Sequence, residues 1–324
     1  MERQQYNAVV RCISRLSFPL DTRELTFPGV QRDTLGSIAC HEYVRHTKRT
    51  IYQHNKPHII AKYYKQFLDA LDAGESAGVL LRMATRLQVA PALLAKFILN
   101  CYANDTDAAY RRMSDRGKRQ RLAQLVREPG LLAEPRVAAE LRLCVLRDNG
   151  YGPLAELVKH TVGLEYEMRL KKKLISLKIP FLDEDDLRRR GHDKTPDVLL
   201  DVPIAVSGCI VNWIESKASF GDDETHEAYM RDQYEKYWSR FGPGMVIYWF
   251  GFIGDLLPAA SARHVLLQHR FPEEQVQFMA PELSVAPLDA ADGDLPLGPL
   301  FDEESDSEEE RPLPEENSEE EVSV

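Results

Sequence analysis

Three polar side chains mark the ends of two apolar segments in the second half of the chain. Asp197 precedes "VLLDVPIAV", and Glu215 and Lys217 end "CIVNWIESK". Residues i and i+2 of a strand project from the same face, so Glu215 and Lys217 are expected to share one side of a sheet. A turn near Ser207-Gly208 would fold the segments into a hairpin and bring Asp197 to the end that carries Glu215.

The two arms of this hairpin are offset by about three residues if they pair without interruption. Pro203 lies within the first arm and cannot donate a ladder hydrogen bond. We therefore expect an irregularity at Pro203 that absorbs the offset, as a β-bulge does. With that correction Asp197, Glu215 and Lys217 converge at one end of the sheet.

Two carboxylates in a partly dry site repel each other and stay ionised when a divalent cation lies between them. Oxygen ligands that leave room for water suit Mg²⁺ or Mn²⁺. Such an ion lowers the pKa of a bound water and stabilises charge on a scissile phosphate. The ammonium of Lys217 would add a second cation near the reacting phosphate. The pattern is therefore that of a phosphodiesterase site with Asp197 and Glu215 as metal ligands.

Each of these residues also has an ordinary structural explanation. Asp197 follows a proline, where turns and strand ends often carry aspartate. Glu215 and Lys217 could form a solvated pair at the edge of a sheet. Their joint placement favours the site over these alternatives. Neither GxSxG nor the phosphate-binding GxxxxGK[ST] and GxGxxG motifs occur in the chain.

Residues 1–150 are expected to form a helical domain, because apolar residues recur there at helical spacing. Within it, Leu80–Asn100 reads as a helix that ends near Gln88, a turn at "VAP", and a second helix with Pro91 in its first turn. Two short helices joined in this way match a helix-turn-helix. An ordinary helical hairpin in a bundle has the same pattern.

Two basic stretches of the helical region could contact phosphates, and the tyrosines among them could stack on unpaired bases. The alternative is a solvated helix face with the tyrosines tucked beneath it. The residues that we expect to bind nucleic acid are Arg45, Lys48, Arg49, Lys62, Arg111, Arg112, Lys118 and Arg119.

Residues 151–281 are expected to form a mixed α/β domain with the order helix, strand, strand, helix, strand. Its first helix would bury an apolar side that includes Leu164, Met168 and Leu174. A second helix is expected from "DDETHEAYMRDQYEKYWSRF", and "MVIYWFGFIG" reads as a buried strand.

The net charge of −10 is unevenly distributed along the chain. Residues 302–324 hold twelve acidic residues and one arginine, which leaves the other residues at +1. Residues 282–324 are expected to be a disordered acidic tail. The absence of a long apolar run argues against a membrane span, and the five scattered cysteines suit a reducing compartment. The charged N-terminus makes secretion unexpected.

These residues resemble known nucleases. Pro196-Asp197, 17 intervening residues and Glu215-Ser216-Lys217 match the PD-(D/E)xK nuclease motif. The wider stretch is similar to the codanin-interacting nuclease family, whose hallmark is the TPD that stands here at Thr195-Pro196-Asp197. The similarity includes "KIPFLDEDDLRRRGHDKTPD" and "YWSRFGPGMVIYWFGF" and extends from the helical N-terminus to about residue 281.

The resemblance implies a restriction-endonuclease-like core, related to Holliday-junction resolvases, behind a helical region with a helix-turn-helix. It also implies Mg²⁺-dependent nuclease activity and codanin as a partner in a chromatin-linked and erythroid-linked pathway. Asp197 and Glu215 take the metal-ligand positions and Lys217 that of the catalytic lysine. The glutamate of the first helix corresponds to Glu167, four residues after Gly163, with Glu165 as the alternative.

The glutamine that many family members carry on the next helix corresponds to Gln233, which is expected to contact nucleic acid. We therefore predict a nuclease of the nucleus and cytoplasm that acts on nucleic acid, with DNA favoured over RNA and with branched and linear substrates both left open. The alternative is a catalytically weak or inactive nuclease fold that serves as a scaffold for codanin.

Overall fold

A computed structural model describes residues 1–20, 25–256 and 264–278. The expected acidic tail, residues 282–324, lies outside the described residues. Residues Met1–Met279 form one compact unit, and the predicted domain boundary near residue 150 lies within it and stays a prediction. None of the helices in the described ranges is long and apolar enough to cross a membrane.

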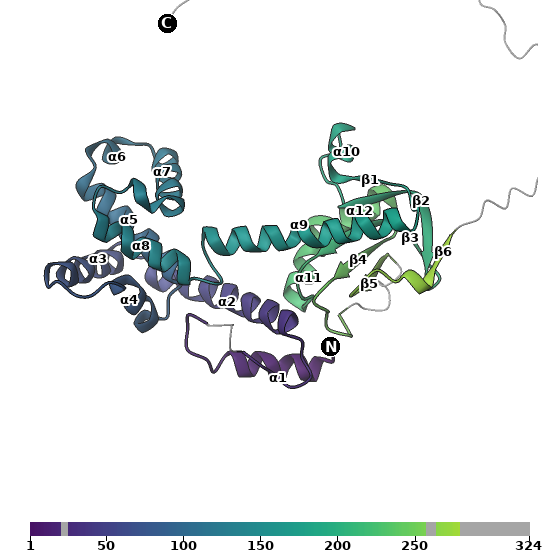
Figure 1. Ribbon diagram of the computed structural model, residues 1–324, viewed down its shortest axis with the longest axis horizontal. Coiled ribbons are helices and arrows are strands. Elements are labelled where there is room, and N and C mark those ends of the chain that lie inside the picture. Colours follow the sequence, from purple (N-terminus) through teal and green to yellow (C-terminus); the bar gives the residue numbers. More distant parts are fainter. Residues whose placement is uncertain (21–24, 257–263, 279–324) are drawn as a thin grey trace, which may run out of the picture. The chain divides into compact units, whose positions relative to one another are not determined.

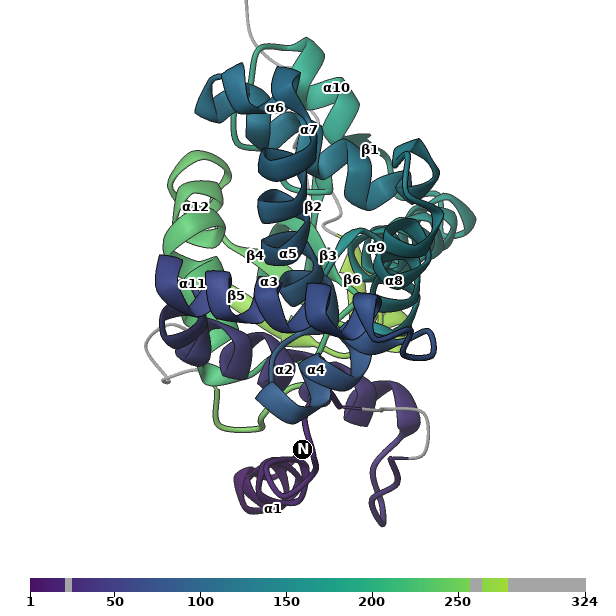
Figure 2. The same cartoon turned by 90° about the vertical axis from the view of Figure 1, so that its left-hand side faces the viewer.

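The expected helical region is confirmed, and Figure 2 views the molecule from its side. Proline starts several of these helices, at the position where its missing N–H is not needed. The helices are α1 (Arg3–Ile13), α2 (Arg32–His54), α3 (Pro57–Asp72), α4 (Val79–Leu87), α5 (Pro91–Thr106), α6 (Ala108–Arg112), α7 (Asp115–Arg127), the short η1 (Pro129–Leu131), and α8 (Pro135–Arg147).

The predicted hairpin of two helices is present as α4 and α5. Gln88 ends α4 in the left-handed conformation with φ 56°, and Pro91 begins α5. A recognition helix reads DNA with exposed residues at its N-terminal end. Here the first residues of α5 are buried in the helical core, so α5 does not present them for base contacts; they are Pro91, Ala92, Leu93, Leu94 and Ala95.

The α/β region that follows is a mixed sheet flanked by helices, which confirms the expected fold class (Figure 1). Its strands run in the order β1-β2-β3-β4-β5, and β6 also pairs with β2. Pairing is antiparallel from β1 to β3 and parallel from β3 to β5. The elements are α9 (Pro153–Ser176), β1 (Phe181–Asp183), α10 (Glu184–Arg189), β2 (Val198–Val206), β3 (Cys209–Lys217), α11 (Asp223–Tyr229), η2 (Met230–Tyr234), α12 (Glu235–Phe241), β4 (Gly244–Tyr248), β5 (Val265–Gln268), η4 (Glu273–Gln275) and β6 (Val276–Phe278).

The β2–β3 hairpin has both the predicted turn and the predicted irregularity. Ser207 and Gly208 form a two-residue turn with φ values of 50° and 78°, as a type I′ turn requires. Leu199 lies opposite Trp213 but Ile204 lies opposite Val211, so β2 gains three residues on β3 between these pairs. Pro203 lies in this interval, and the gain matches the offset expected from the sequence.

The sheet is buried on both faces. On one face the C-terminal half of α9 packs Leu170 and Leu174 onto strand residues such as Val198 and Ile214. The predicted apolar side of this helix is correct for Leu174 and wrong for Leu164 and Met168, which are 45% and 55% exposed. The side of α9 that packs on the sheet carries Leu170 and Leu174 instead.

On the other face Trp213 packs against Tyr234 and Tyr237, in a core that continues into the helical region. A side chain at Gly244 would collide with the Trp213 ring, at 2.1 Å from the nearest ring atom, so β4 needs glycine there. The expected helix over residues 222–241 is confirmed as the uninterrupted run of α11, η2 and α12, with a π-helical turn at η2 in its middle. The short strands β1, β5 and β6 were not predicted.

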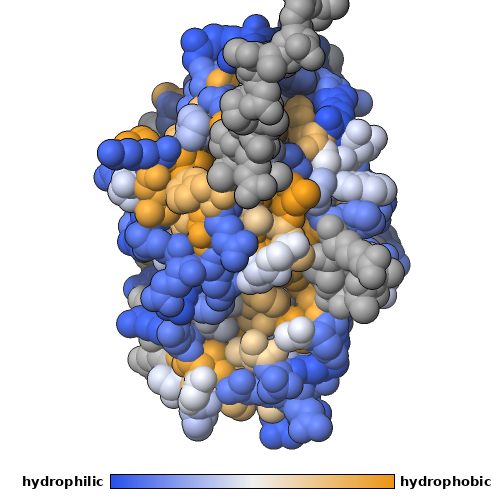
Figure 3. Space-filling model, turned by 90° about the vertical axis from the view of Figure 1, so that its right-hand side faces the viewer, coloured by the Kyte–Doolittle hydropathy of each residue, from blue (hydrophilic) through white to orange (hydrophobic). Residues whose placement is uncertain are grey.

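Hydrophobic surface also interrupts the hydrophilic surface on the face that Figure 3 shows. Among the sheet residues, Val202, Ile210 and Phe278 are 51%, 47% and 62% exposed. Single exposed apolar residues of this kind are normal on soluble proteins.

Candidate active site

Asp197 and Glu215 meet at the end of the β2–β3 ladder. Val198 pairs with Ile214, so the next position brings Asp197 beside Glu215. The backbone N–H of Asp197 donates to Glu215 Oε2 at 3.3 Å, and the backbone N–H of Ser216 donates to Asp197 Oδ2 at 2.7 Å. The register shift at Pro203 therefore has a direct consequence, because it aligns two carboxylates that an uninterrupted hairpin would separate.

Lys217 joins the same cluster from the same face of β3. Its Nζ donates to Glu215 Oε1 at 2.6 Å and to Gln233 Oε1 at 3.0 Å. The ammonium also lies 4.6 Å from the centroid of the Tyr229 ring, which is a cation–π distance. The structure thus brings Asp197, Glu215 and Lys217 together, as the sequence predicts, and adds Gln233, for which only a contact with nucleic acid was expected.

Gln233 lies within the π-helical turn η2, and Tyr229 is the last residue of α11 before that turn. Such turns are rare and occur frequently at functional sites. Here both side chains contact the ammonium of Lys217, which therefore has partners on two elements besides its own strand. Sequence reasoning missed Tyr229, although its position four residues before Gln233 was a usable sign.

Glu167 reaches toward the cluster from α9, and the charges of Glu215 and Lys217 act on its pKa in opposite directions. Glu165 points elsewhere: its side chain is 56% exposed and paired with Arg169 at 2.5 Å. Of the two glutamates left open by the sequence, Glu167 is the one beside the cluster.

The charges in the cluster are not balanced. Burial raises the pKa of Asp197, and the negative charge of Glu215 raises it further, against the opposing effect of Lys217. Burial also raises the pKa of Glu167, despite Lys171. Burial disfavours the ammonium of Lys217, but Glu215 and Asp197 outweigh this and raise its pKa, so Lys217 is charged at neutral pH.

The Thr195 backbone is fixed from two sides next to the site. The hydroxyl of Tyr237 donates to the Thr195 carbonyl at 2.8 Å, and the Thr195 hydroxyl donates to Glu184 Oε1 at 3.3 Å. These contacts hold the residues before Asp197 against α12 and α10. Sequence reasoning also missed Tyr237 and Glu184 as supports of the site.

The donor set has to be compared with the needs of a metal ion. The described ranges contain no cluster of three or more His, Cys, Asp or Glu side chains arranged to hold a metal. Magnesium, however, keeps several waters and is commonly bound through only one or two carboxylates. The adjacent carboxylates of Asp197 and Glu215, with their excess negative charge, fit that requirement.

The basic residues predicted to bind nucleic acid do not behave alike. Arg45 is an error of that prediction: its guanidinium is only 15% exposed and pairs with Glu42, Asp222 and Glu224. Its charge is therefore already neutralised within the protein. Lys118 is partly buried, hydrogen-bonded to Asn104 Oδ1 at 3.2 Å and close to the Tyr110 ring. The exposed ones are Lys48, Arg49, Lys62, Arg111, Arg112 and Arg119.

Of the two alternatives for the tyrosines, burial beneath the helix face holds for two of them, and base stacking stays open for a third. Tyr43 and Tyr63 are buried, at 2% and 8% exposure, and so belong to the helical core. Tyr52 is 64% exposed and could stack on a base. Tyrosine is half apolar, so sequence alone does not separate a core position from a surface position.

The relatives found by comparison with known proteins share one name, and one family model also matches the chain. The family described as "Protein of unknown function TPD sequence-motif" matches residues 133–271. The chain is 39% identical over 275 residues to "CDAN1-interacting nuclease 1" of Danio rerio, covering 84% of this chain and 89% of the relative. The protein of the same name from Homo sapiens is 38% identical over 277 residues, with 84% and 95% covered. No solved structure matches the chain.

Proposed function

Because the chain belongs to the CDAN1-interacting nuclease 1 family, we propose that it is a metal-dependent nuclease that hydrolyses phosphodiester bonds. The observation that carries the proposal is the convergence of Asp197, Glu215 and Lys217 at one end of the β2–β3 hairpin. A carboxylate pair with an adjacent ammonium is the donor set that PD-(D/E)xK chemistry needs.

Asp197 and Glu215 would hold a Mg²⁺ or Mn²⁺ ion, and Glu167 on α9, proposed as a third metal carboxylate, is not grouped with them as a direct ligand in the described part of the chain and would act through a water of the ion. When bound, the ion supplies Lewis acidity toward the phosphate and acidifies water. The Ser216 N–H, which donates to Asp197 Oδ2, orients that carboxylate toward its neighbour. The hydrogen bonds at Thr195 fix the backbone that carries Asp197.

Lys217 would stabilise negative charge on the phosphate oxygens during cleavage. Its raised pKa keeps the ammonium charged, and Gln233 and Tyr229 restrain where Nζ lies. A donor that is held in place before the reaction loses little energy to reorganisation when charge develops.

Nucleic acid is the proposed substrate, with DNA favoured over RNA. The exposed residues Lys48, Lys62, Arg111, Arg112 and Arg119 would contact its phosphates. Codanin is the proposed partner, since the relatives are named for interaction with CDAN1. The proposed location is the nucleus and the cytoplasm.

One observation favours a second function, a scaffold for codanin that retains the nuclease fold with little or no activity. Lys217 occupies Glu215 Oε1, so one oxygen of a proposed metal ligand already has a partner within the chain. In a protein that no longer binds a metal, the ammonium of Lys217 would balance the charge of Glu215 in place of the metal ion.

Cleavage assays decide between the two functions. The purified protein is incubated with single-stranded, duplex, flapped and four-way DNA and with the matching RNA, with Mg²⁺, with Mn²⁺ and with chelator. We expect cleavage of at least one substrate that depends on the metal and is lost in Asp197→Asn. Absence of cleavage on every substrate, together with retained binding to purified codanin, would establish the scaffold instead.

A further inference from the structure

One side of α9 is apolar and exposed along most of its length. Leu157, Leu164, Met168 and Ile175 are 60%, 45%, 55% and 65% exposed. Because an α-helix has 3.6 residues per turn, their spacing places all four on one side, over about 27 Å of helix. We call these four residues the α9 stripe. The C-terminal half of the helix buries a different side against the sheet, so the stripe is not needed for that packing.

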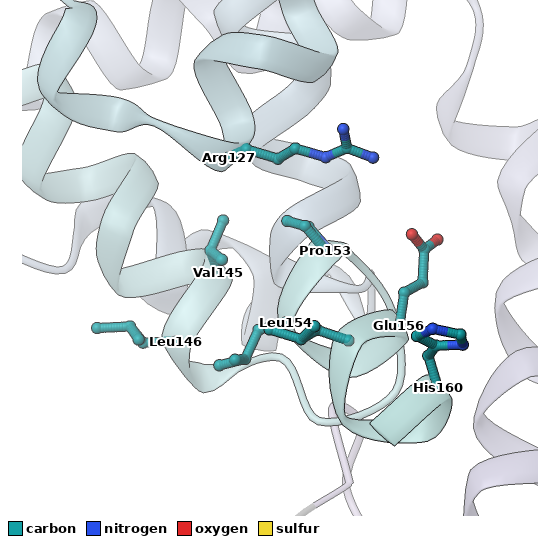
Figure 4. Close-up of a pocket in the computed structure, with 8 residues that line it drawn as sticks. Arg127, Val145, Leu146, Pro153, Leu154, Glu156 and His160 are labelled. Atoms are coloured by element: carbon teal, nitrogen blue, oxygen red, sulfur yellow. The ribbon is translucent and has the colours of Figure 1, made fainter. Parts of the chain in front are cut away.

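A groove lies at the N-terminal end of α9 (Figure 4), where the stripe begins. The groove has a volume of about 540 Å³, and Leu157 forms part of its wall. Leu146 at the end of α8 also lines it and is 56% exposed. Figure 4 shows the apolar side chains of α8 and of the start of α9 around this hollow, with Arg127, Glu156 and His160 also at the groove. Stripe and groove together make one elongated apolar surface.

Positive charge lies along this surface. Arg127 lines the groove, and Lys172 lies one turn from both Met168 and Ile175 on α9. Both are exposed, and neither takes part in an ion pair with another residue in the described ranges. Glu165, in contrast, is paired with Arg169, which leaves Glu156 as the acidic exception.

We propose that the α9 stripe and its groove dock an amphipathic helix of codanin. A helix whose apolar residues at positions i, i+3, i+4 and i+7 recur over about 18 residues would match the roughly 27 Å of the stripe. Acidic residues beside those positions would meet Lys172 and Arg127. The existence of the partner rests on the proposed function; the position and chemistry of the contact come from the exposed surface.

Binding of purified codanin to the full chain tests the docking. Leu164→Glu with Met168→Glu places two charges in the centre of the stripe and should weaken binding by at least about tenfold. Val202→Glu with Ile210→Glu, at comparably exposed positions on the sheet, is the matched control and should stay within about twofold. Thermal unfolding of each variant checks that it folds, and Leu164→Ser with Met168→Ser replaces the first variant if it does not.

Charge reversal gives an independent arm. Lys172→Glu should weaken codanin binding several-fold at low salt, and the difference should shrink at high salt because exposed charges are screened. Codanin binding that is unchanged by the folded stripe variants would overturn the docking surface alone. A chain that fails to bind codanin in any form would remove the partner as well. Sedimentation of the unaltered chain as a dimer that the stripe variant dissociates would assign the stripe to a second copy.

Discussion

Asp197 and Asp222 are two aspartates near the ends of β2 and β3, and the protein treats their charges in opposite ways. Asp222 is 1% exposed and begins α11, where it accepts from the Thr225 N–H at 3.0 Å. Arg45 and His41 reach it from α2 at 2.7 Å and 2.9 Å. Although burial alone would raise its pKa, the bonds from His41 and Thr225 and the charge of Arg45 lower the pKa of Asp222.

Around Asp197 the neighbouring charges are mostly of the same sign. Burial and Glu215 raise its pKa, and Lys217 offsets this only in part. A buried carboxylate that pairs with a cationic side chain of the protein can hold two elements together. A buried carboxylate beside a second carboxylate favours binding of a cation from solvent, such as a metal ion. The comparison therefore separates a structural ion cluster that joins α2 to α11 from a candidate metal site.

The largest expected effect is on cleavage, and it should separate the two clusters. Asp197→Asn and Glu215→Gln remove ligand charge at nearly constant shape and should each lower metal-dependent cleavage by at least about 100-fold. Lys217→Ala should lower it by a similar factor while leaving metal binding largely intact. Single-turnover cleavage and calorimetric titration of Mg²⁺ measure the two effects.

The control for this experiment is Glu165→Gln, on the same helix as Glu167 but exposed and paired with Arg169. Its cleavage rate should stay within about twofold of the unaltered protein. Cleavage at the unaltered rate by Asp197→Asn would remove the site and with it the proposed nuclease mechanism.

The second largest effect should be a loss of stability when the structural cluster is broken. Asp222→Asn removes the most buried of the three carboxylates that pair with Arg45, and the contact to His41 with it, and should lower the free energy of unfolding by about 2 kcal/mol at neutral pH. Because the folded-state pKa of Asp222 is lowered, its stabilisation is present above the ordinary aspartate pKa and is lost as pH falls below it. The gap between variant and unaltered protein should therefore shrink at acid pH in urea titrations. A gap that widens there would contradict this account.

The contrast between the clusters also shows what sequence can and cannot predict. Asp197, Glu215 and Lys217 were predicted because strand geometry is local: a period of two, a turn at Ser207-Gly208 and a proline that interrupts pairing. The order of the main elements was predicted for the same reason. The short strands β1, β5 and β6 were missed because three or four residues carry too little pattern.

Long-range contacts were the other limit. Arg45 was assigned to nucleic acid because its neighbours in sequence are basic, but its partner Asp222 lies 177 residues away. Leu164 and Met168 were assigned to the core because helical periodicity does not say which of two apolar sides faces the sheet. In both cases the deciding fact was which distant element packs against the residue.

A smaller effect concerns stability at the candidate metal site, and its sign should be opposite to that at Asp222. Asp197→Asn removes a buried carboxylate from beside Glu215 and should raise the free energy of unfolding by about 1 kcal/mol at neutral pH. Mg²⁺ should raise the melting temperature of the unaltered protein, because it binds the folded state, and should have little effect on the variant. Calorimetric scans with and without Mg²⁺ test both statements, and a variant that melts well below the unaltered protein would refute the idea of unbalanced charge.

The smallest effect should come from Tyr229, which contacts Lys217 but is not expected to touch the phosphate. Its ring lies 4.6 Å from the ammonium, and a cation–π contact of this kind contributes about 1 kcal/mol when it is partly desolvated. Tyr229→Leu should therefore lower kcat by about fivefold with KM nearly unchanged, whereas Tyr229→Phe keeps the ring and should restore most of the rate. Phe278→Leu, at an exposed aromatic residue of β6, is the control for loss of an aromatic side chain elsewhere. If Tyr229→Phe lost as much activity as Tyr229→Leu, the hydroxyl and not the ring would be the functional group, and the positioning of Lys217 would depend on Glu215 and Gln233 alone.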